Sequence, residues 1–229
     1  MISDKLFVLG DSIARGVMYD ENTSRYTICR DTFDQALKAL GVSVKNLSKP
    51  GCTSKAALPI LDKCEQSDGA VMAIEFGGND SDLVWKEVAE TPDEAHKALV
   101  PLEEYGNTLK TLISHARGIG MRPVIVTPLP VVADRYFKWI SKPLDESAIM
   151  RYLGSCQYIY RWQERYAYAA MEAAREARCP VFDLRSLFLG LRDFESLMSA
   201  DGIHPNPDGH LFIKNAVLDA WKKDSLNLA

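Results

Sequence analysis

The chain has 229 residues, of which 47% are hydrophobic and 25% are charged, and its formal net charge is −4. This composition supplies a sizeable core and excludes a disordered or collagen-like chain. Because the sequence holds no basic cluster, we expect the protein to bind neither nucleic acid nor an anionic membrane surface.

Short apolar segments rich in β-branched residues alternate with longer segments of helical periodicity, the pattern of βα units on a parallel sheet. In chain order, strands are predicted over residues 5–9, 42–47, 69–76, 123–127 and 180–184. Helices are predicted over about 31–40, 54–64, 102–119, 156–178 and 208–223. The expected fold is an α/β protein, a three-layer α/β/α sandwich around a five-stranded parallel sheet. With no repeat and no linker, residues 1–229 are expected to form one domain.

Two segments are longer than the connections that such a fold prefers. Residues 81–101 follow the third predicted strand, and residues 131–154 follow the fourth. We expect these lid-like insertions to form walls of a binding pocket.

Aromatic residues are concentrated in the second insertion and in the helix behind it, where nine of the chain's 21 aromatic residues lie. Those at helical spacing are expected to form part of the core. Tyr136, Phe137 and Trp139 lie off that stripe and are candidates for a substrate groove or a subunit contact.

The five cysteines form no C-x-x-C pair, so neither a disulfide framework nor a zinc site is expected. Apolar runs fall well short of the roughly 18 residues of a spanning helix, and the first residues do not resemble a signal peptide. We therefore expect a cytoplasmic protein with reduced thiols and no membrane partner.

The first predicted strand leads into Gly10-Asp11-Ser12, which has two interpretations. It is either a plain turn, in which Asp11 or Ser12 caps a helix, or a turn that exposes the Ser12 hydroxyl as a nucleophile. In the second case the backbone N–H of Ser12 also faces a developing oxyanion.

The second strand is followed by Pro50 and Gly51, a strong turn signal. A glycine here also allows close approach of a ligand to an unobstructed backbone N–H. The neighbouring Cys52 has no partner pattern and is expected to be a small buried thiol.

The third strand ends in Gly77-Gly78-Asn79-Asp80, which is also common turn chemistry. The side-chain amide of Asn79 could nevertheless donate to an oxyanion in the same cleft.

Asp201 and His204 lie three residues apart in a loop constrained by glycine and proline. A carboxylate that accepts from Nδ1 fixes the tautomer of the imidazole and leaves Nε2 as a base. A metal site is an alternative, because Asp208 and His210 are close in sequence, but no recognised ligand pattern is present.

These motifs all follow strands, and the carboxyl ends of parallel strands meet at one edge of the sheet. With the strand order 2-1-3-4-5, the point where the order reverses falls between the first and third strands. Ser12 and Asn79 would then flank a single cleft, with Gly51 close by and the last loop folded over it.

The motifs resemble the four blocks of the SGNH, or GDSL-type, hydrolase superfamily, which carry Ser, Gly, Asn and His in this chain order. They are Ser12, Gly51, Asn79 and His204, within a match that spans about residues 5 to 220. One departure is Ile13, where the family name has leucine. The resemblance implies a flavodoxin-like fold.

For activity, the resemblance implies a catalytic triad of Ser12, His204 and Asp201. It implies an oxyanion hole formed by the N–H groups of Ser12 and Gly51 and by the Asn79 side chain. No metal and no organic cofactor is implied.

The leading hypothesis is a serine esterase that acts on carboxylic esters of small acyl groups, O-acetylated carbohydrates among them. The alternative within the enzymes is a lipid-directed esterase or thioesterase, similar to a lysophospholipase. The alternative of another class is a non-catalytic, flavodoxin-like binding module. A small-molecule ester is the expected partner, and the sequence indicates no oligomeric state.

Overall fold

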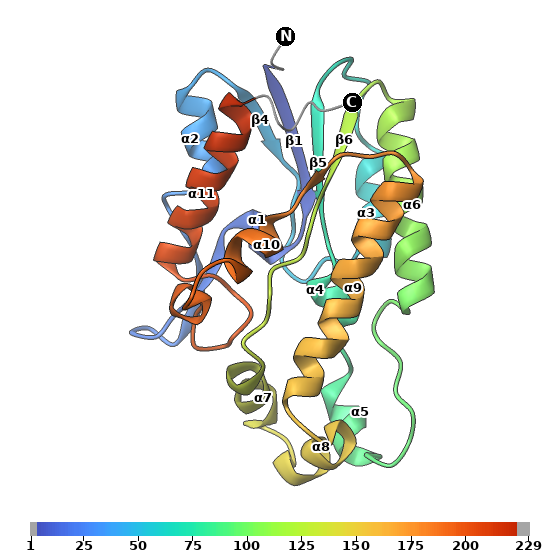
Figure 1. The fold of residues 1–229 in the computed structure, drawn as a ribbon, viewed down its shortest axis with the longest axis vertical. Helices are drawn as coiled ribbons and strands as arrows, with labels where there is room; N and C mark the ends of the chain where they lie inside the picture. Colours follow the sequence, from blue (N-terminus) through green and yellow to red (C-terminus); the bar gives the residue numbers. More distant parts are fainter. Residues whose placement is uncertain (1–3, 224–229) are drawn as a thin grey trace.

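A parallel sheet forms the centre of the molecule in the computed structural model, which describes residues 4–223. Its strands, in chain order, are β1 (Lys5–Gly10), β4 (Ser43–Asn46), β5 (Val71–Glu75), β6 (Arg122–Val126) and β7 (Val181–Phe182). They lie in the order β4-β1-β5-β6-β7, and every neighbouring pair is parallel. The predicted strand order is therefore confirmed, and β1 and β5 lie side by side (Figure 1).

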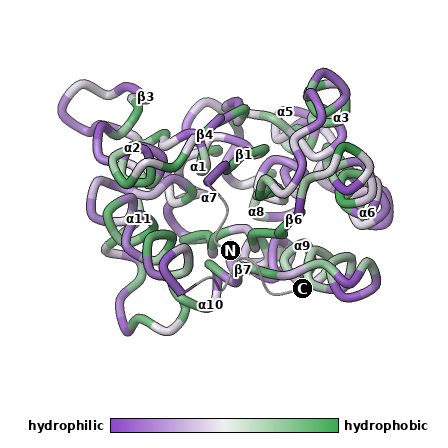
Figure 2. The backbone as a smooth tube through the Cα atoms, turned by 90° about the horizontal axis from the view of Figure 1, so that it is seen from above, coloured by the Kyte–Doolittle hydropathy of each residue, from purple (hydrophilic) through white to green (hydrophobic). Residues whose placement is uncertain are grey.

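Helices cover both faces of the sheet, which makes the predicted three layers (Figures 1 and 2). One face carries α2 (Phe33–Ala39) and α11 (Pro207–Lys222). The other carries α3 (Ser54–Leu61), α6 (Leu102–Gly118) and α9 (Gln157–Glu176). Within residues 4–223, no helix combines the length and the apolarity that crossing a bilayer requires.

Each helical layer is held by burial of the apolar stripe that its periodicity predicts. On the first face, Leu37 and Trp221 share a buried cluster with the strand residue Val8. On the second face, Leu109 and Tyr166 are buried with residues of β5. Such burial removes apolar surface from water, at about 25 cal/mol per Å², and it fixes the sheet between the two layers.

The segment after β1 does not form a long helix. Helix α1 (Ser12–Arg15) is a single turn, because Gly16 adopts φ of 86° and ends it in the left-handed conformation. An antiparallel hairpin of β2 (Val17–Asp20) and β3 (Arg25–Ile28) follows, which the sequence pattern does not predict. The last strand is also shorter than predicted, because α10 (Leu184–Leu189) begins directly after Asp183, which caps it.

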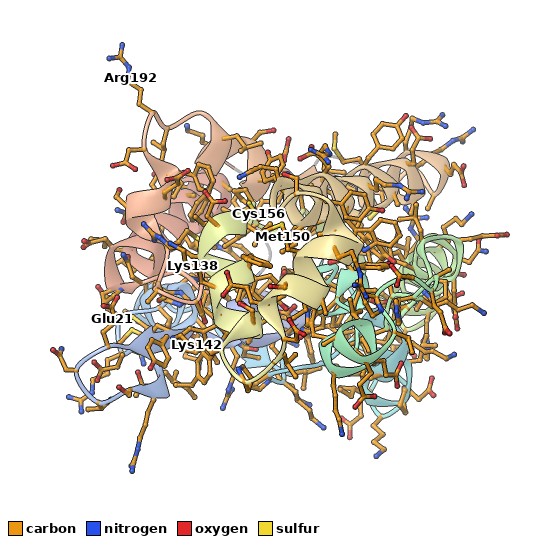
Figure 3. The ribbon with its side chains drawn as sticks, turned by 90° about the horizontal axis from the view of Figure 1, so that it is seen from below. Glu21, Lys138, Lys142, Met150, Cys156 and Arg192 are labelled. Atoms are coloured by element: carbon orange, nitrogen blue, oxygen red, sulfur yellow. The ribbon has the colours of Figure 1, made fainter. Side chains whose placement is uncertain are left out.

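Both insertions are helical. Residues 81–101 contain α5 (Trp85–Glu90), and residues 131–154 contain α7 (Ala133–Ser141) and α8 (Glu146–Leu153). Helix α5 packs against α8, and α7 packs against both α8 and α9. The view from below shows α7, with Lys138 on it and Lys142 directly after it, beside α8, which carries Met150 (Figure 3).

Three short elements complete the described chain: α4 (Gly78–Ser81) after β5, α10, and the 3-10 helix η1 (Phe194–Leu197). Helices α1 and α4 follow directly on the adjacent strands β1 and β5, so both begin at the same edge of the sheet. This is the edge where the sequence motifs meet.

Candidate active site

Ser12 lies where strand β1 gives way to helix α1. A Cβ at Gly10 would lie 2.9 Å from the Cβ of Ala14, so the turn requires glycine. The Asp11 side chain accepts a 2.8 Å hydrogen bond from the N–H of Ile13 and caps the helix, one of the two caps that the motif predicts. Ser12 is then the first residue of α1, and its N–H donates no hydrogen bond to any residue between 4 and 223.

His204 connects Ser12 to Asp201. Its Nε2 lies 2.9 Å from the Ser12 Oγ, and its Nδ1 lies 2.6 Å from the Asp201 Oδ2. An ionised carboxylate only accepts hydrogen bonds, so Nδ1 carries a proton and the neutral ring presents Nε2 as the acceptor of the Ser12 hydroxyl. The side chains therefore form an unbroken hydrogen-bonded line.

Asp201 is held in its charged form by its surroundings. Burial acts to raise the pKa of Asp201, but hydrogen bonds from His204 and from the backbone outweigh it and hold the pKa below its usual value. The backbone donors are the N–H groups of Ile203 and His204, each 3.1 Å from Oδ1. The carboxylate is thus fixed on both oxygens.

The loop that carries Asp201 and His204 is attached to the start of α7. The N–H of Val132 donates to the carbonyl of Gly202 at 2.8 Å, and the N–H of Ser199 donates to the carbonyl of His204 at 2.8 Å. Gly202 has φ of 78°, and a Cβ there would lie 2.6 Å from the carbonyl oxygen of Val132. Only glycine therefore allows this approach of loop and helix.

Gly51 lies in the turn after β4. The N–H of Lys49 donates to the carbonyl of Gly10 at 3.1 Å, which ties the turn to the end of β1. Gly51 is exposed, has φ of 73°, and its N–H donates to no other described residue. Cys52 beside it is buried, and burial raises the pKa of its thiol, which does not favour a nucleophilic thiolate.

Asn79, on α4, contacts both of the other strand-end motifs. Its Nδ2 donates to the Asp11 Oδ2 at 3.0 Å and to the carbonyl of Cys52 at 3.2 Å. The turns after β1, β4 and β5 therefore converge, and the last loop brings His204 to Ser12.

A cavity of about 220 Å³ opens beside Ser12 and His204. This volume lies below the roughly 300–1,000 Å³ of pockets for drug-sized ligands. The first and second insertions and α9 supply most of its apolar and aromatic wall. Among these wall residues are Leu83, Trp85, Tyr136, Leu153, Ile159 and Trp162.

Three acidic residues line this cavity, Asp11, Glu75 and Asp82, and Asp82 is the one that lies in the first insertion. Its Oδ1 accepts hydrogen bonds from Trp85 Nε1 and from the Tyr136 hydroxyl, both at 2.8 Å. Burial raises the pKa of Asp82, and the two hydrogen bonds counteract it. The contact joins α5 of the first insertion to α7 of the second.

The three aromatic candidates of the second insertion occupy different places. Tyr136 lines the cavity. Phe137 is buried in an apolar cluster with Leu153 and is not among the cavity-lining residues. Trp139 lies against the hairpin, with its ring 4.6 Å from that of Tyr19 in an edge-to-face contact, and the Lys142 ammonium lies 4.0 Å from its centre.

The residues of the alternative metal site are not brought together. The Nε2 of His210 is buried 3.0 Å from the carbonyl oxygen of Val17, and Asp208 is exposed. Over residues 4–223, no group of three or more His, Cys, Asp or Glu side chains is arranged to hold a metal ion.

The motifs miss three residues near the site. Tyr26 lies on the hairpin, its ring 5.2 Å from the His204 ring, and Asp82 lies in the cavity. The third is Glu75, which is buried at the end of β5. A charged residue inside the apolar stretch of residues 71–76 is a sequence signal for Glu75. Neither Tyr26 nor Asp82 belongs to a recognisable motif.

The fold and the site together define a class of protein. It is an α/β sandwich with a parallel sheet, and at the carboxyl edge of that sheet a serine hydroxyl, an imidazole and a buried carboxylate are hydrogen-bonded in line. This arrangement is consistent with a serine hydrolase.

The sequence matches the model of the GDSL-like Lipase/Acylhydrolase family over residues 8–211. The chain belongs to this family, as the four motifs predict.

Curated relatives align with this chain over only part of their own length. The chain is 29% identical over 145 residues to the isoamyl acetate-hydrolyzing esterase 1 homolog of Homo sapiens, covering 62% of this chain and 51% of that protein. It is 25% identical over 178 residues to the GDSL esterase/lipase CPRD49 of Arabidopsis thaliana, covering 76% and 64%. The chain thus spans about half the length of the first relative.

Solved structures match over nearly the whole chain. The lipase/acylhydrolase from Enterococcus faecalis superposes with a TM-score of 0.64 at 20% identity, covering 96% of both chains. The acetylxylan esterase Axe2 from Geobacillus stearothermophilus superposes with a TM-score of 0.59 at 18% identity, covering 95% of this chain and 93% of that one. These similarities establish the fold.

Proposed function

We propose that the protein is a serine esterase that hydrolyses carboxylic esters through an acyl-enzyme on Ser12. The observation that carries the proposal is the line from Asp201 through His204 to Ser12, with contacts of 2.6 and 2.9 Å. His204 takes the hydroxyl proton as Ser12 attacks the ester carbonyl, and Asp201 stabilises the resulting imidazolium. His204 then protonates the leaving alcohol, and a water molecule repeats the cycle to release the acid.

The oxyanion is stabilised by the N–H groups of Ser12 and Gly51 and by the side chain of Asn79. Neither backbone N–H donates to another described residue, so both can donate to a substrate. The Asn79 amide gives up its longer hydrogen bond, 3.2 Å to the carbonyl of Cys52, and donates to the oxyanion instead. It keeps its hydrogen bond to Asp11. Each donor is expected to contribute about 3 kcal/mol at the transition state.

The substrates proposed are esters of small acyl groups, including acetyl groups on carbohydrates. The cavity volume of about 220 Å³ supports a compact acyl group rather than a long chain. The names of two similar proteins, an isoamyl acetate-hydrolyzing esterase homolog and an acetylxylan esterase, point the same way. The apolar wall is what a lipid-directed esterase or thioesterase would also use, so chain length must be measured.

The test of chemistry uses p-nitrophenyl acetate and a fluorophosphonate probe. Wild-type protein is expected to turn over the ester and to be labelled at Ser12, whereas Ser12→Ala does neither. Ser147→Ala, at an exposed position of α8, is the control and should behave as wild type. A folded wild-type protein that is neither active nor labelled would overturn the esterase proposal, whereas turnover that is lost in Ser12→Ala rejects the binding-module alternative.

The test of substrate class is a series of p-nitrophenyl esters from acetyl to palmitoyl, together with acetylated sugars. We expect kcat/KM to be highest for the short acyl groups. A maximum at long chains would favour the lipid-directed alternative, and a preference for the thioester over the matched ester would favour a thioesterase.

A further inference from the structure

Two carboxyl groups lie buried together near Ser12, among the residues that line its cavity. Glu75 is the last residue of β5, and its partner across the sheet is Gly10, the residue before Asp11. Asp11 is 2% exposed and Glu75 is 5% exposed, and the two carboxyl groups lie close enough that each shifts the pKa of the other. The proposed catalytic mechanism does not use Glu75.

Two neighbouring buried carboxyl groups can hydrogen-bond to each other only if one of them carries a proton, because ionised carboxylates only accept. Both oxygens of Asp11 already accept hydrogen bonds, from the N–H of Ile13 and from the side-chain amide of Asn79. The Oε2 of Glu75, in contrast, is buried and has no donor among the described residues. The geometry therefore points to Glu75 as the protonated member of the pair.

The surroundings favour the same assignment. Burial raises the pKa of Glu75, and the negative charge of Asp11 raises it further. Burial also raises the pKa of Asp11, but the hydrogen bond from the N–H of Ile13 and the proximity of Glu75 and His204 lower it. The other titratable groups that act on the pair are Asp80, which repels Asp11, and the buried hydroxyl of Tyr105 near both carboxyls.

Asp11 is the residue through which this proton affects the site. One oxygen caps the helix that begins with Ser12, and the other holds Asn79 at 3.0 Å. Ionisation of Glu75 would place two like charges in contact inside the protein, and separating them would move Asp11. The packing leaves little room for such a shift, since a Cβ at Gly10 would already lie 3.2 Å from the Oε2 of Glu75.

We propose that Glu75 is a positioning residue, which retains a proton and donates it in a hydrogen bond to Asp11, and so fixes both the Asn79 amide and the turn that carries Ser12. This role rests on the proposed esterase function, because it is exerted on the groups that bind the oxyanion. Glu75 itself acts only through Asp11.

The experiment compares Glu75→Gln with Glu75→Leu. Glutamine keeps a donor of the same length, and leucine keeps most of the bulk but removes the donor. We expect Glu75→Gln to retain kcat within about threefold, and Glu75→Leu to lose about 10- to 100-fold in kcat with little change in KM, since only transition-state stabilisation is lost. Glu90→Gln, at an exposed position of α5, is the matched control.

The dependence on pH separates positioning from simple packing. Above the raised pKa of Glu75 the wild-type protein loses the donor, whereas the glutamine amide does not ionise. The ratio of kcat for Glu75→Gln to that of wild type should therefore rise with pH on the alkaline side. A Glu75→Gln variant as impaired as Glu75→Leu, or a Glu75→Leu variant with wild-type kcat and a normal melting temperature, would overturn the proposal.

A readout without turnover keeps this inference separate from the esterase proposal. Carbonyl-detected ¹³C NMR of the wild-type protein should show, at pH 7, one protonated glutamate carboxyl that is absent from Glu75→Gln. If that signal is present and the protein has no esterase activity, the protonated pair stands and the proposed function fails. If Glu75 is ionised at pH 7, the positioning role fails whatever the activity.

Discussion

Asp201 is the residue on which the tautomer of His204 depends. Its Oδ2 accepts from Nδ1 at 2.6 Å, while its Oδ1 accepts two backbone N–H groups of its own loop. In Asp201→Asn the Oδ1 contacts can persist, but an amide facing Nδ1 favours the wrong tautomer. We expect kcat to fall by a factor on the order of 10⁴, with the melting temperature little changed. A loss of stability parallel to the loss of activity would contradict this role.

Asp80 makes the stability of the fold depend on pH. Its pKa is raised to about 6 from 3.8, chiefly by burial, although hydrogen bonds from Ser54 lower it. A folded-state pKa above the unfolded value means that the contribution to stability is full below pH 3.8 and is lost as the pH rises through about 6. The shift corresponds to at most about 3 kcal/mol.

Asp80→Asn keeps the acceptor for Ser54 and removes the charge. We therefore expect its melting temperature, relative to wild type, to rise between pH 4 and pH 7 and to level off above. Asp219→Asn, at an exposed position of α11, is the control and should show no such trend. A difference between Asp80→Asn and wild type that is constant across this range would exclude Asp80 as the source.

Residues with special chemistry at the ends of strands could be located from the sequence. Ser12, Gly51, Asn79, Asp201 and His204 were placed at one edge because parallel strands end together, and the structure brings them together there. Asp82 was not found, because its role depends on partners that the tertiary structure creates, whereas Glu75 carries a signal, a charged residue in an apolar stretch, that the motifs do not include. Their roles, like those of the motif residues, stay predictions until measured.

The loop of Asp201 and His204 depends on its contact with α7. Gly202→Ala would place a Cβ 2.6 Å from the carbonyl oxygen of Val132, against backbone that cannot yield, and at φ of 78°. We expect a loss of about 3 kcal/mol or more in the free energy of unfolding, together with a large fall in kcat because His204 shifts. Urea unfolding and ester hydrolysis measure the two effects.

Gly41→Ala is the matched control for this loop. Gly41 has a similar φ of 86°, but a Cβ there meets no atom within 4 Å. It should cost about 1 to 2 kcal/mol from the backbone conformation alone and leave kcat unchanged. Equal effects of the two substitutions would mean that the approach of the loop to α7 is unimportant.

Elements with a long apolar stripe were predictable, and short ones were not. Helices α6, α9 and α11 begin and end within about two residues of the predicted bounds, because their periodicity matches the face that they bury. The hairpin of β2 and β3 has strands of four residues each, with mostly polar or half-exposed positions, so no apolar alternation identifies it. The helices α5, α7 and α8 were not predicted, because the two insertions were interpreted only as lid-like segments and no elements were assigned within them.

At the scale of the whole molecule, residues far apart in sequence build one cavity. The catalytic edge comes from the strands of the sheet, whereas the wall opposite comes from α5, α7, α8 and α9. The two insertions meet at Asp82, which accepts hydrogen bonds from Trp85 of the first insertion and Tyr136 of the second. The surplus length of the chain is therefore used to shape the space beside Ser12, where we expect acyl-chain length to be decided.

Tyr136→Phe tests whether the contact between the insertions defines that space. The substitution removes the 2.8 Å hydrogen bond to Asp82 and leaves this partly buried carboxylate with Trp85 Nε1 as its remaining side-chain donor among the described residues. We expect a loss of about 2 kcal/mol in the free energy of unfolding and a broader chain-length profile, because α5 and α7 are less firmly joined. Tyr168→Phe, at a side chain that is 65% exposed, should change neither quantity. If Tyr136→Phe matched this control in both stability and chain-length profile, the cavity wall would be set by apolar packing alone.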